Sequence, residues 1–324
     1  MQPLVTVITP SFNQGQYIRA TIESVLGQDY PQIEYIVIDG GSTDSTVNVL
    51  KSCHDPRLVW ISEPDRGQTD ALNKGLRRAR GAYLTYLNSD DLLLPRAIST
   101  IVESFERDAT IDLIYGDCRF IDMDGAPILT ARAAPFDLTH VVTGKLAILQ
   151  PGTVWRRRVF EKLGFFWDEL HYCMDIDYWI RAGAADCRFS YLPGARSAFR
   201  LHQTSKSMSQ APLFWNEWLR ILDRQYGRDD LADTLAAVKA AAYAYVAWNT
   251  VKAQWSAKQY VQARPALRQF ALHGSSGRRI AAASMLLDSY LPTALTPRLY
   301  GLAQRLQDSA MLRQTFSALK GWRK

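Results

Sequence analysis

Two adjacent carboxylates, Asp90 and Asp91, follow the short apolar and aromatic segment Tyr83–Leu87. That segment has the composition of a buried strand, and Pro95 beyond the carboxylates is suited to open a helix. Ligands of open α/β sheets bind in the crevice outside the carboxyl ends of the strands. Two like charges in an apolar setting are costly unless a cation or hydrogen-bond donors meet them. These residues therefore predict a site for a Mg²⁺ or Mn²⁺ ion bound to substrate phosphates.

Three earlier segments also have the composition of buried strands: Leu4–Thr9, Ile33–Ile38 and Leu58–Ser62. Each is followed by a polar or glycine-containing turn and then by apolar residues at helical spacing. Strand and helix thus alternate four times before residue 106. This alternation predicts a three-layer α/β/α fold with a mostly parallel, Rossmann-like sheet.

Neither of the common phosphate-binding loops is present in the sequence. The pair Gly40-Gly41 does not form the pattern GxGxxG and follows the second predicted strand, and no Walker A pattern occurs. A nucleotide bound at this sheet would therefore be held by carboxylates and a metal ion.

The net charge of +6 belongs to the end of the chain. Residues 278–324 carry eight Lys or Arg against two Asp, and the remainder has 30 basic and 30 acidic side chains. Such a tail suits an anionic surface such as acidic lipid, although a solvated helical surface explains it equally well. No basic stripe interleaved with aromatic residues occurs elsewhere, so a nucleic-acid partner is not expected.

Composition and segment pattern predict a cytoplasmic protein in two parts. The four cysteines form no CxxC pair, no run of 18 apolar residues occurs, and a strand-like segment near the first residue leaves no room for a signal peptide. From about residue 215 the chain is rich in Ala, Leu and Arg, which is typical of helices. We expect an α/β domain over residues 1–212 and a helical C-terminal region over residues 213–324.

Five segments, in this order, resemble the family 2 glycosyltransferases, which have the GT-A fold. They are Thr6–Asn13, Val37–Asp44, Glu63–Gly67, Asn88–Asp91 and Met174–Arg181. The resemblance covers residues 4–207 and implies inverting transfer of a sugar from a nucleoside diphosphate to a hydroxyl group, assisted by Mg²⁺ or Mn²⁺. It implies UDP as the carrier, with dTDP and GDP as alternatives. A glycan or lipid-linked acceptor, as in bacterial surface polysaccharide assembly, would suit a basic tail that touches the inner face of the membrane.

The resemblance implies a nucleotide-binding role for residues that follow the first three strands. Asp39 would contact the nucleobase or ribose, and Thr9 and Pro10 would shape the base pocket. Asp65 and Arg66 would lie near the nucleotide. The alternatives are that Asp39 caps a helix, that Thr9 and Pro10 only form a turn, and that Asp65 and Arg66 form a surface ion pair.

For the metal, the resemblance implies Asp91 as the ligand, with Asp90 reaching the ribose or supporting the ion. His202, in a later polar loop, would ligate the metal or donate to a phosphate oxygen, with Lys206 as a second cation. The alternatives are that Asp91 caps a following helix and that His202 is simply solvated. A Lewis acid is needed because the departing diphosphate gains negative charge.

The resemblance implies that Asp175 is the general base. It would take the proton from an acceptor hydroxyl group that attacks the anomeric carbon opposite the leaving group, which inverts the configuration. The matching family motif reads Glu-Asp-x-Asp, and Met174 stands here in place of the Glu. Asp177 is expected to pair with Arg181 one helical turn later.

Two other functions fit parts of this pattern. A nucleotidyltransferase also combines α/β layers with metal-bound carboxylates, but its glycine- and basic-rich phosphate loop is missing from Pro10–Gly15. A nucleotide- or carbohydrate-binding module without turnover is suggested by Met174, whereas Asp91 and Asp175 argue against it. Donor hydrolysis with and without metal would separate these functions.

Overall fold

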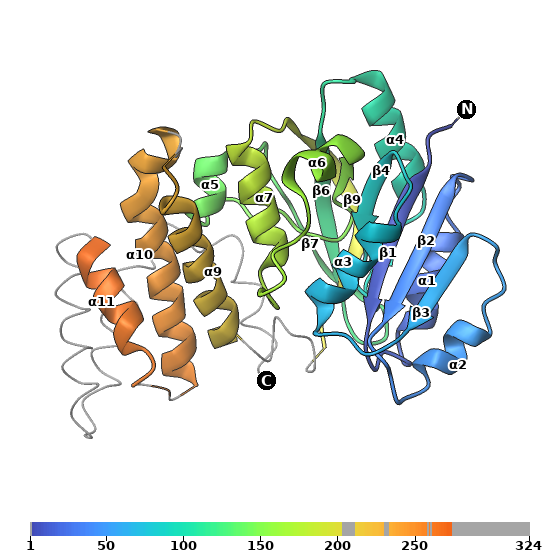
Figure 1. Ribbon diagram of the computed structural model, residues 1–324, viewed down its shortest axis with the longest axis horizontal. Coiled ribbons are helices and arrows are strands. Elements are labelled where there is room, and N and C mark those ends of the chain that lie inside the picture. The colour runs from blue at the N-terminus through green and yellow to red at the C-terminus, as the bar shows by residue number, and fades with distance from the viewer. Residues whose placement is uncertain (1, 203–210, 230–232, 258, 260, 274–324) are drawn as a thin grey trace. The chain divides into compact units, whose positions relative to one another are not determined.

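The computed structural model describes residues 2–202, 211–229, 233–257, 259 and 261–273 (Figure 1). Within them the chain forms two compact units. The α/β unit consists of the residues up to Phe136 and of the segment from Ala147 to His202. The helical unit consists of Asp137–Leu146 and of the described residues from Ala211 onward. The boundary at residue 212 stays a prediction, because residues 203–210 lie outside the described residues.

The described strands of the α/β unit form one sheet in the order β3-β2-β1-β4-β8-β6-β9-β5, with β7 beside β6. The strands are β1 (Val5–Ser11), β2 (Ile33–Asp39), β3 (Leu58–Ser62), β4 (Tyr83–Tyr86), β5 (Leu92–Leu93), β6 (Leu113–Ile121), β7 (Pro127–Ala131), β8 (Val154–Arg156) and β9 (Phe189–Arg200). Strands β1 to β4 are parallel, so their carboxyl ends meet at one edge of the sheet. β6 and β9 are also parallel, while β8 is antiparallel to β4 and β6.

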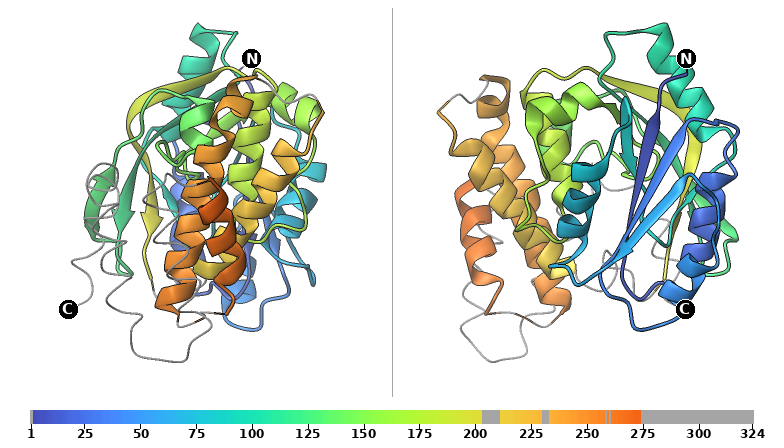
Figure 2. Two further views of the ribbon diagram at one scale, coloured as in Figure 1. Left: turned by 90° about the vertical axis from the view of Figure 1, so that its left-hand side faces the viewer. Right: turned by 45° about the vertical axis from the view of Figure 1, so that its right-hand side comes forward.

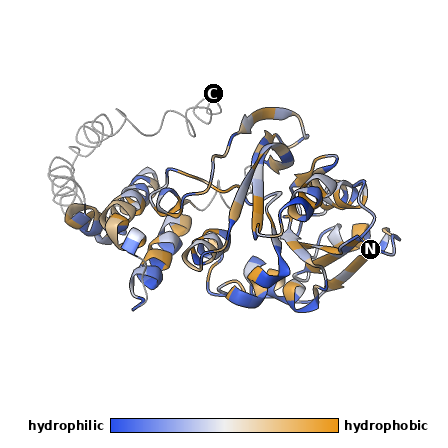
Figure 3. Cartoon of the chain, turned by 90° about the horizontal axis from the view of Figure 1, so that it is seen from above, coloured by the Kyte–Doolittle hydropathy of each residue, from blue (hydrophilic) through white to orange (hydrophobic). Residues whose placement is uncertain are grey.

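Helices cover both faces of this sheet (Figure 2). They are α1 (Ile18–Leu26), α2 (Thr46–Lys51), α3 (Gln68–Arg78), α4 (Ala97–Arg107), α6 (Arg157–Leu163) and α7 (Met174–Ala184). Residues of α1, α2 and α4 share a core with Val5, Val7 and Val37, whereas α3 packs on Ile36 and Ile38 of the opposite face. Apolar residues, orange in Figure 3, run along the strands between these layers. The predicted α/β/α fold is therefore confirmed.

Helix α3 lies unusually close to the sheet. A Cβ atom at Gly75 would be only 2.4 Å from Cγ2 of Ile8 in β1, so a larger residue fits only if the Ile8 side chain or the helix moves. This close packing sets the distance between α3 and strands β1 and β2.

The long strand β9 reaches Arg200, two residues before His202, which was expected in a polar loop. A bulge interrupts the pairing of β9 with β6 near Gly194, whose φ of 99° favours glycine. Asp117 of β6 accepts hydrogen bonds there from the Gly194 amide (2.9 Å) and the Tyr191 hydroxyl group (2.7 Å). The strand then continues to Arg200, at the end where β5 pairs with it.

The helical unit contains α5 (Leu138–Val142), α9 (Ala211–Tyr226), α10 (Asp233–Ser256) and α11 (Arg264–His273). Buried residues point to several sides of α10, because α9 and α11 both pack against it. Its core with α11 includes Trp248, Val251, Leu267 and Phe270. Residues 278–324, the basic tail on which the expected membrane contact depends, lie outside the described residues. No helix in the described ranges combines the length and apolarity that a membrane span requires.

Candidate active site

Asp91 lies buried in the turn after β4, with 1% of its surface exposed. Its Oδ1 accepts a hydrogen bond from the Arg200 amide (3.0 Å), and its Oδ2 accepts one from the Asn88 side-chain amide (3.1 Å). Burial and then the negative charge of Asp90 raise the pKa of Asp91 well above its usual value. The turn therefore concentrates negative charge that a cation would stabilise.

The end of β9 brings His202 to this turn. His202 is 4% exposed, its Nε2 is 2.8 Å from Oδ2 of Asp90, and its ring lies 4.9 Å from that of Tyr17. The Arg200 Nε donates to the backbone oxygen of Asp90 (2.9 Å). Asp91 precedes strand β5 and does not cap a helix, and His202 is not solvated, so both structural alternatives are wrong.

The donor types at this turn suit a hard divalent cation. Carboxylate oxygens are ligands that suit Mg²⁺ and Mn²⁺, and Mg²⁺ commonly uses one or two protein carboxylates together with substrate phosphates. Among the described residues, no three His, Cys, Asp or Glu side chains are grouped to hold a metal ion. Binding of Mg²⁺ or Mn²⁺ at this turn therefore stays a prediction.

Asp175 lies in the first turn of α7 and is half-buried. Its Oδ1 accepts a hydrogen bond from the Ile176 amide (2.9 Å). Removal from water raises the pKa of Asp175 from 3.8 to about 6, and the hydrogen bond from Ile176 opposes this effect only in part. A carboxylate with such a pKa is suited to accept a proton near neutral pH.

Tyr86, at the end of β4, connects these two carboxylates. Burial raises the pKa of Tyr86, and the negative charges of Asp175 and Asp91 raise it further. Its ring meets that of Phe166 edge-on at 5.7 Å, in the loop that leads to α7. Asp91 and Asp175, remote in sequence, therefore both raise the pKa of the same phenol group.

Asp39 is fully buried at the end of β2 and uses both oxygens within its own turn. Oδ2 accepts from the amides of Gly41 (3.2 Å) and Ser42 (3.0 Å) and from the Ser62 hydroxyl group (2.6 Å), while Oδ1 accepts from the Ser42 hydroxyl group. The carboxylate shapes the turn, and its contact with a nucleoside stays a prediction.

Thr9 and Pro10 are buried in the last part of β1. The Thr9 hydroxyl group lies 3.0 Å from that of Tyr35 in the neighbouring strand. These residues support the sheet beneath the turn, and their place in a base pocket stays a prediction.

Asp65 and Arg66 have different surroundings. Asp65 is half-buried beside Gly40, accepts a hydrogen bond from the Gly67 amide (2.8 Å), and has its pKa raised mainly by burial. The Arg66 side chain is 72% exposed and pairs with Asp70 and Asp168 at 3.3 and 3.1 Å. The structure therefore brings Asp65 to the turn of Asp39, whereas Arg66 forms surface ion pairs with Asp70 and Asp168.

Phe12 is a candidate that the sequence reasoning missed. It is 56% exposed in the loop after β1. The next residue, Asn13, binds the turn after β2: its amide donates to the Ser42 hydroxyl group (2.7 Å), and its Oδ1 accepts from the Thr43 amide (2.9 Å). An aromatic residue between polar ones directly after a strand was the available signal.

The α/β unit and the arrangement of its strands define the GT-A class of glycosyltransferase folds. The structure is similar to that of TarS residues 1–349 of S. aureus, with a TM-score of 0.62 and 18% identity over 94% of this chain and 92% of that one. It is also similar to the mannosyltransferase PcManGT from Pyrobaculum calidifontis, solved with GDP-Man and Mn²⁺, with a TM-score of 0.60 and 19% identity over 96% and 89% of the chains.

The chain belongs to glycosyl transferase family 2, whose model matches residues 6–164. An uncharacterized glycosyltransferase of Mycobacterium tuberculosis is 32% identical over 186 residues, which cover 56% of this chain and 69% of that protein. The chondroitin synthase of Escherichia coli is 35% identical over 125 residues, 38% of this chain but only 18% of the synthase. The family match includes Asp91 and ends before Asp175 and His202.

Proposed function

We propose that this protein is an inverting, metal-assisted glycosyltransferase that transfers a sugar from a nucleoside diphosphate, foremost UDP, to a hydroxyl group. One observation carries the proposal. The negative charges of buried Asp91 and of half-buried Asp175, whose own pKa is about 6, both raise the pKa of Tyr86. A metal-binding group and a base then serve one reaction. Family membership favours sugar transfer over nucleotidyl transfer.

In this mechanism Asp175 is the base. Its carboxylate accepts the proton of the acceptor hydroxyl group while that oxygen attacks the anomeric carbon from the face opposite the diphosphate. Asp91, with Asp90 and His202 beside it, would hold a Mg²⁺ or Mn²⁺ ion that stabilises the charge of the leaving diphosphate. One displacement of this kind inverts the anomeric configuration.

The nucleoside is expected at the carboxyl ends of β1, β2 and β3. The exposed ring of Phe12 offers an apolar face for the base, and Asp65 offers a half-buried carboxylate near Asp39. Thr9 and Pro10 would form the floor beneath them. Similar folds solved with UDP-GlcNAc or with GDP-Man and Mn²⁺ support a nucleoside diphosphate sugar as donor.

The acceptor is proposed to be a glycan or a lipid-linked saccharide. A cytoplasmic enzyme whose basic tail contacts the membrane would be suited to a lipid-linked acceptor. The similarity to the chondroitin synthase of Escherichia coli supports a glycan acceptor.

A donor screen tests the proposal. The protein is incubated with UDP-GlcNAc, UDP-glucose, dTDP-glucose and GDP-mannose, with Mn²⁺, Mg²⁺ or EDTA, and release of the nucleoside diphosphate is measured. We expect release from one donor, at least about tenfold slower in EDTA and in Asp91→Asn, because the leaving charge is then less stabilised. Nucleotide binding without release in any condition would identify a binding module instead.

A further inference from the structure

The first residue of α3 is linked to the Asp91 turn through one side-chain amide. The Gln68 Nε2 donates to Oδ1 of Asn88 (2.7 Å), and the Asn88 Nδ2 donates to Oδ2 of Asp91 (3.1 Å). Because Gln68 occupies the oxygen of the Asn88 amide, the amide nitrogen is turned toward Asp91. Helix α3 thereby sets the orientation of the group that contacts the proposed metal ligand.

Two other residues of α3, one helical turn apart, hold the loop that leads to Asp175. Thr69, 1% exposed, donates its hydroxyl proton to the backbone oxygen of Leu170. Asn73, 4% exposed, donates to the Phe166 oxygen and accepts from the Phe166 amide, both at 3.0 Å. Residues four apart share a helix face, so Thr69 and Asn73 together hold the backbone at both ends of residues 166–170.

These contacts also place an aromatic side chain of the site. The Phe166 ring lies 5.7 Å from that of Tyr86 and 4.6 Å from that of Tyr178 in α7. Asn73 fixes the backbone from which this ring projects. The position of α7, and of Asp175 in its first turn, therefore depends on where α3 holds this loop.

We infer that Gln68, Thr69 and Asn73 are positioning residues of α3 that fix the Asp91 turn and the loop before Asp175 relative to each other. The helix is a rigid support because Gly75 brings it against β1. The inference rests on the proposed function for the roles of Asp91 and Asp175. A displacement of about 1 Å in such a geometry can lower a rate about 100-fold, so these side chains act on turnover without touching the substrate.

The first test compares Thr69→Val, which removes the hydroxyl donor at nearly constant volume, with Thr69→Ser, which retains it. Amide hydrogen exchange is measured in the full-length protein. In Thr69→Val we expect exchange over residues 166–175 to be about tenfold faster or more, and exchange in β1 and β2 to be unchanged, because a local support is lost. Thr69→Ser should match the wild type. Equal exchange over residues 166–175 in all three proteins would overturn the inference.

A matched control removes a similar hydroxyl group elsewhere. Thr250, 1% exposed in α10, donates to the Val246 oxygen at 2.9 Å. Thr250→Val should leave exchange over residues 166–175 unchanged. Accelerated exchange of that loop in Thr250→Val as well would show a general loss of stability and would count against a specific role for Thr69.

The second test measures release of the nucleoside diphosphate, with Mn²⁺, from whichever of UDP-GlcNAc, UDP-glucose, dTDP-glucose and GDP-mannose the wild type cleaves. In Thr69→Val we expect kcat to fall about 10- to 100-fold, with KM for that donor within about twofold of the wild type, because the base is displaced and the donor is not. In an Asp175→Asn background the same substitution should cause no further loss. An equal loss in both backgrounds would show that Thr69 does not act through Asp175.

The two tests separate failure of the inference from failure of the proposed function. A wild-type protein that releases no nucleoside diphosphate from any donor refutes the proposed function, and hydrogen exchange alone then decides whether α3 holds the loop. Full activity of Asp175→Asn would show that Asp175 is not the base. Loss of activity in Asp175→Asn together with wild-type behaviour of Thr69→Val refutes the positioning role only.

Discussion

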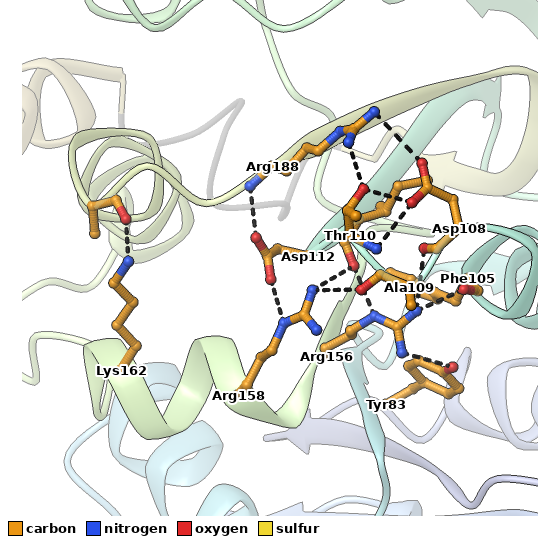
Figure 4. Close-up of polar contacts among 12 residues, drawn as sticks. Tyr83, Phe105, Asp108, Ala109, Thr110, Asp112, Arg156, Arg158, Lys162 and Arg188 are labelled. Carbon is orange, nitrogen blue, oxygen red and sulfur yellow. Dashed lines mark hydrogen bonds and ion pairs between the residues drawn. The ribbon is translucent and has the colours of Figure 1, made fainter.

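The charged side chains at the two ends of the sheet in the α/β unit have opposite surroundings. At the amino end of β4, arginines meet carbonyl and carboxylate oxygens (Figure 4). Arg156 donates to the oxygens of Ile111 (2.7 Å) and Phe105 (2.6 Å), and Arg158 pairs with Asp112 at 2.6 Å. At the carboxyl end, burial raises the pKa values of Asp91 and Asp175.

The difference separates charges that stabilise the fold from charges that serve a reaction. At the amino end, hydrogen bonds from Thr110 lower the pKa of Asp108, so its charged form favours the folded state. At the carboxyl end, ionisation of Asp91 and Asp175 destabilises the folded state, because burial raises both pKa values. This pattern is expected where a bound ligand stabilises the charges. Substitutions at either end of the sheet test this difference.

The largest expected effect is on turnover. Asp175→Asn should lower the rate of sugar transfer about 10²- to 10⁴-fold, because the neutral amide cannot accept the acceptor proton. Initial rates with the donor identified in the screen provide the measurement. A loss of less than about threefold would remove Asp175 from the role of base.

The same substitution should stabilise the protein near neutral pH. The pKa of Asp175 is about 6 in the folded chain and 3.8 ordinarily, so the group favours folding most below pH 3.8 and this stability is lost as the pH rises toward 6. Near pH 7.5, Asp175→Asn should raise the free energy of unfolding by up to about 3 kcal/mol, measured by urea denaturation. At pH 4 the two proteins should be nearly equal; a stabilisation independent of pH would contradict this explanation.

At the amino end the expected effect is the reverse. Arg156→Met should lower the free energy of unfolding by about 2 kcal/mol, because buried carbonyl groups of Phe105 and Ile111 lose charged donors. Activity per folded molecule should stay within about twofold of the wild type, since these contacts lie away from the site. Arg96→Met is the control, because Arg96 and Asp29, with side chains 72% and 45% exposed, pair at 3.6 Å on the surface and should contribute less than about 1 kcal/mol. Equal losses in the two variants would contradict the comparison.

The smallest expected effect is the pH dependence of the wild type. Because the pKa of Asp175 is raised to about 6, the rate should be about tenfold lower at pH 5 than above pH 7. The profile of kcat/KM between about pH 4.5 and 8 provides the measurement. A midpoint near 4 would show that the carboxylate is more exposed to water than the structure indicates.

The sequence predicted the elements whose signals are local. Strands β1 to β4 were recognisable because their apolar runs end in polar turns, and the same turns contained Asp39, Asp65 and Asp91. Strand β5, only two residues long, could not be predicted, because it depends on pairing with Ala198 and Ser197 more than 100 positions later.

The same limit applies to the site. The type and order of the motifs indicated Asp91 and Asp175, but nothing local showed that the Arg200 amide binds Asp91 or that Asp39 is enclosed by its own turn. Thr69 and Asn73 gave no signal, because polar residues on a helix are ordinarily solvated. Their role became visible only once the loop of Phe166 was placed against them.

Gly75 has no functional group, yet the spacing between two layers of the molecule depends on it. Were a methyl group added there, either the Ile8 side chain or α3 would have to move, and a shift of α3 would displace the residues of its first turns. Tolerance to substitution at this position is therefore set by how accurately Gln68 and Thr69, about two helical turns away, must be placed. In relatives that keep the reaction, we expect a wider residue only where β1 offers a smaller partner than Ile8.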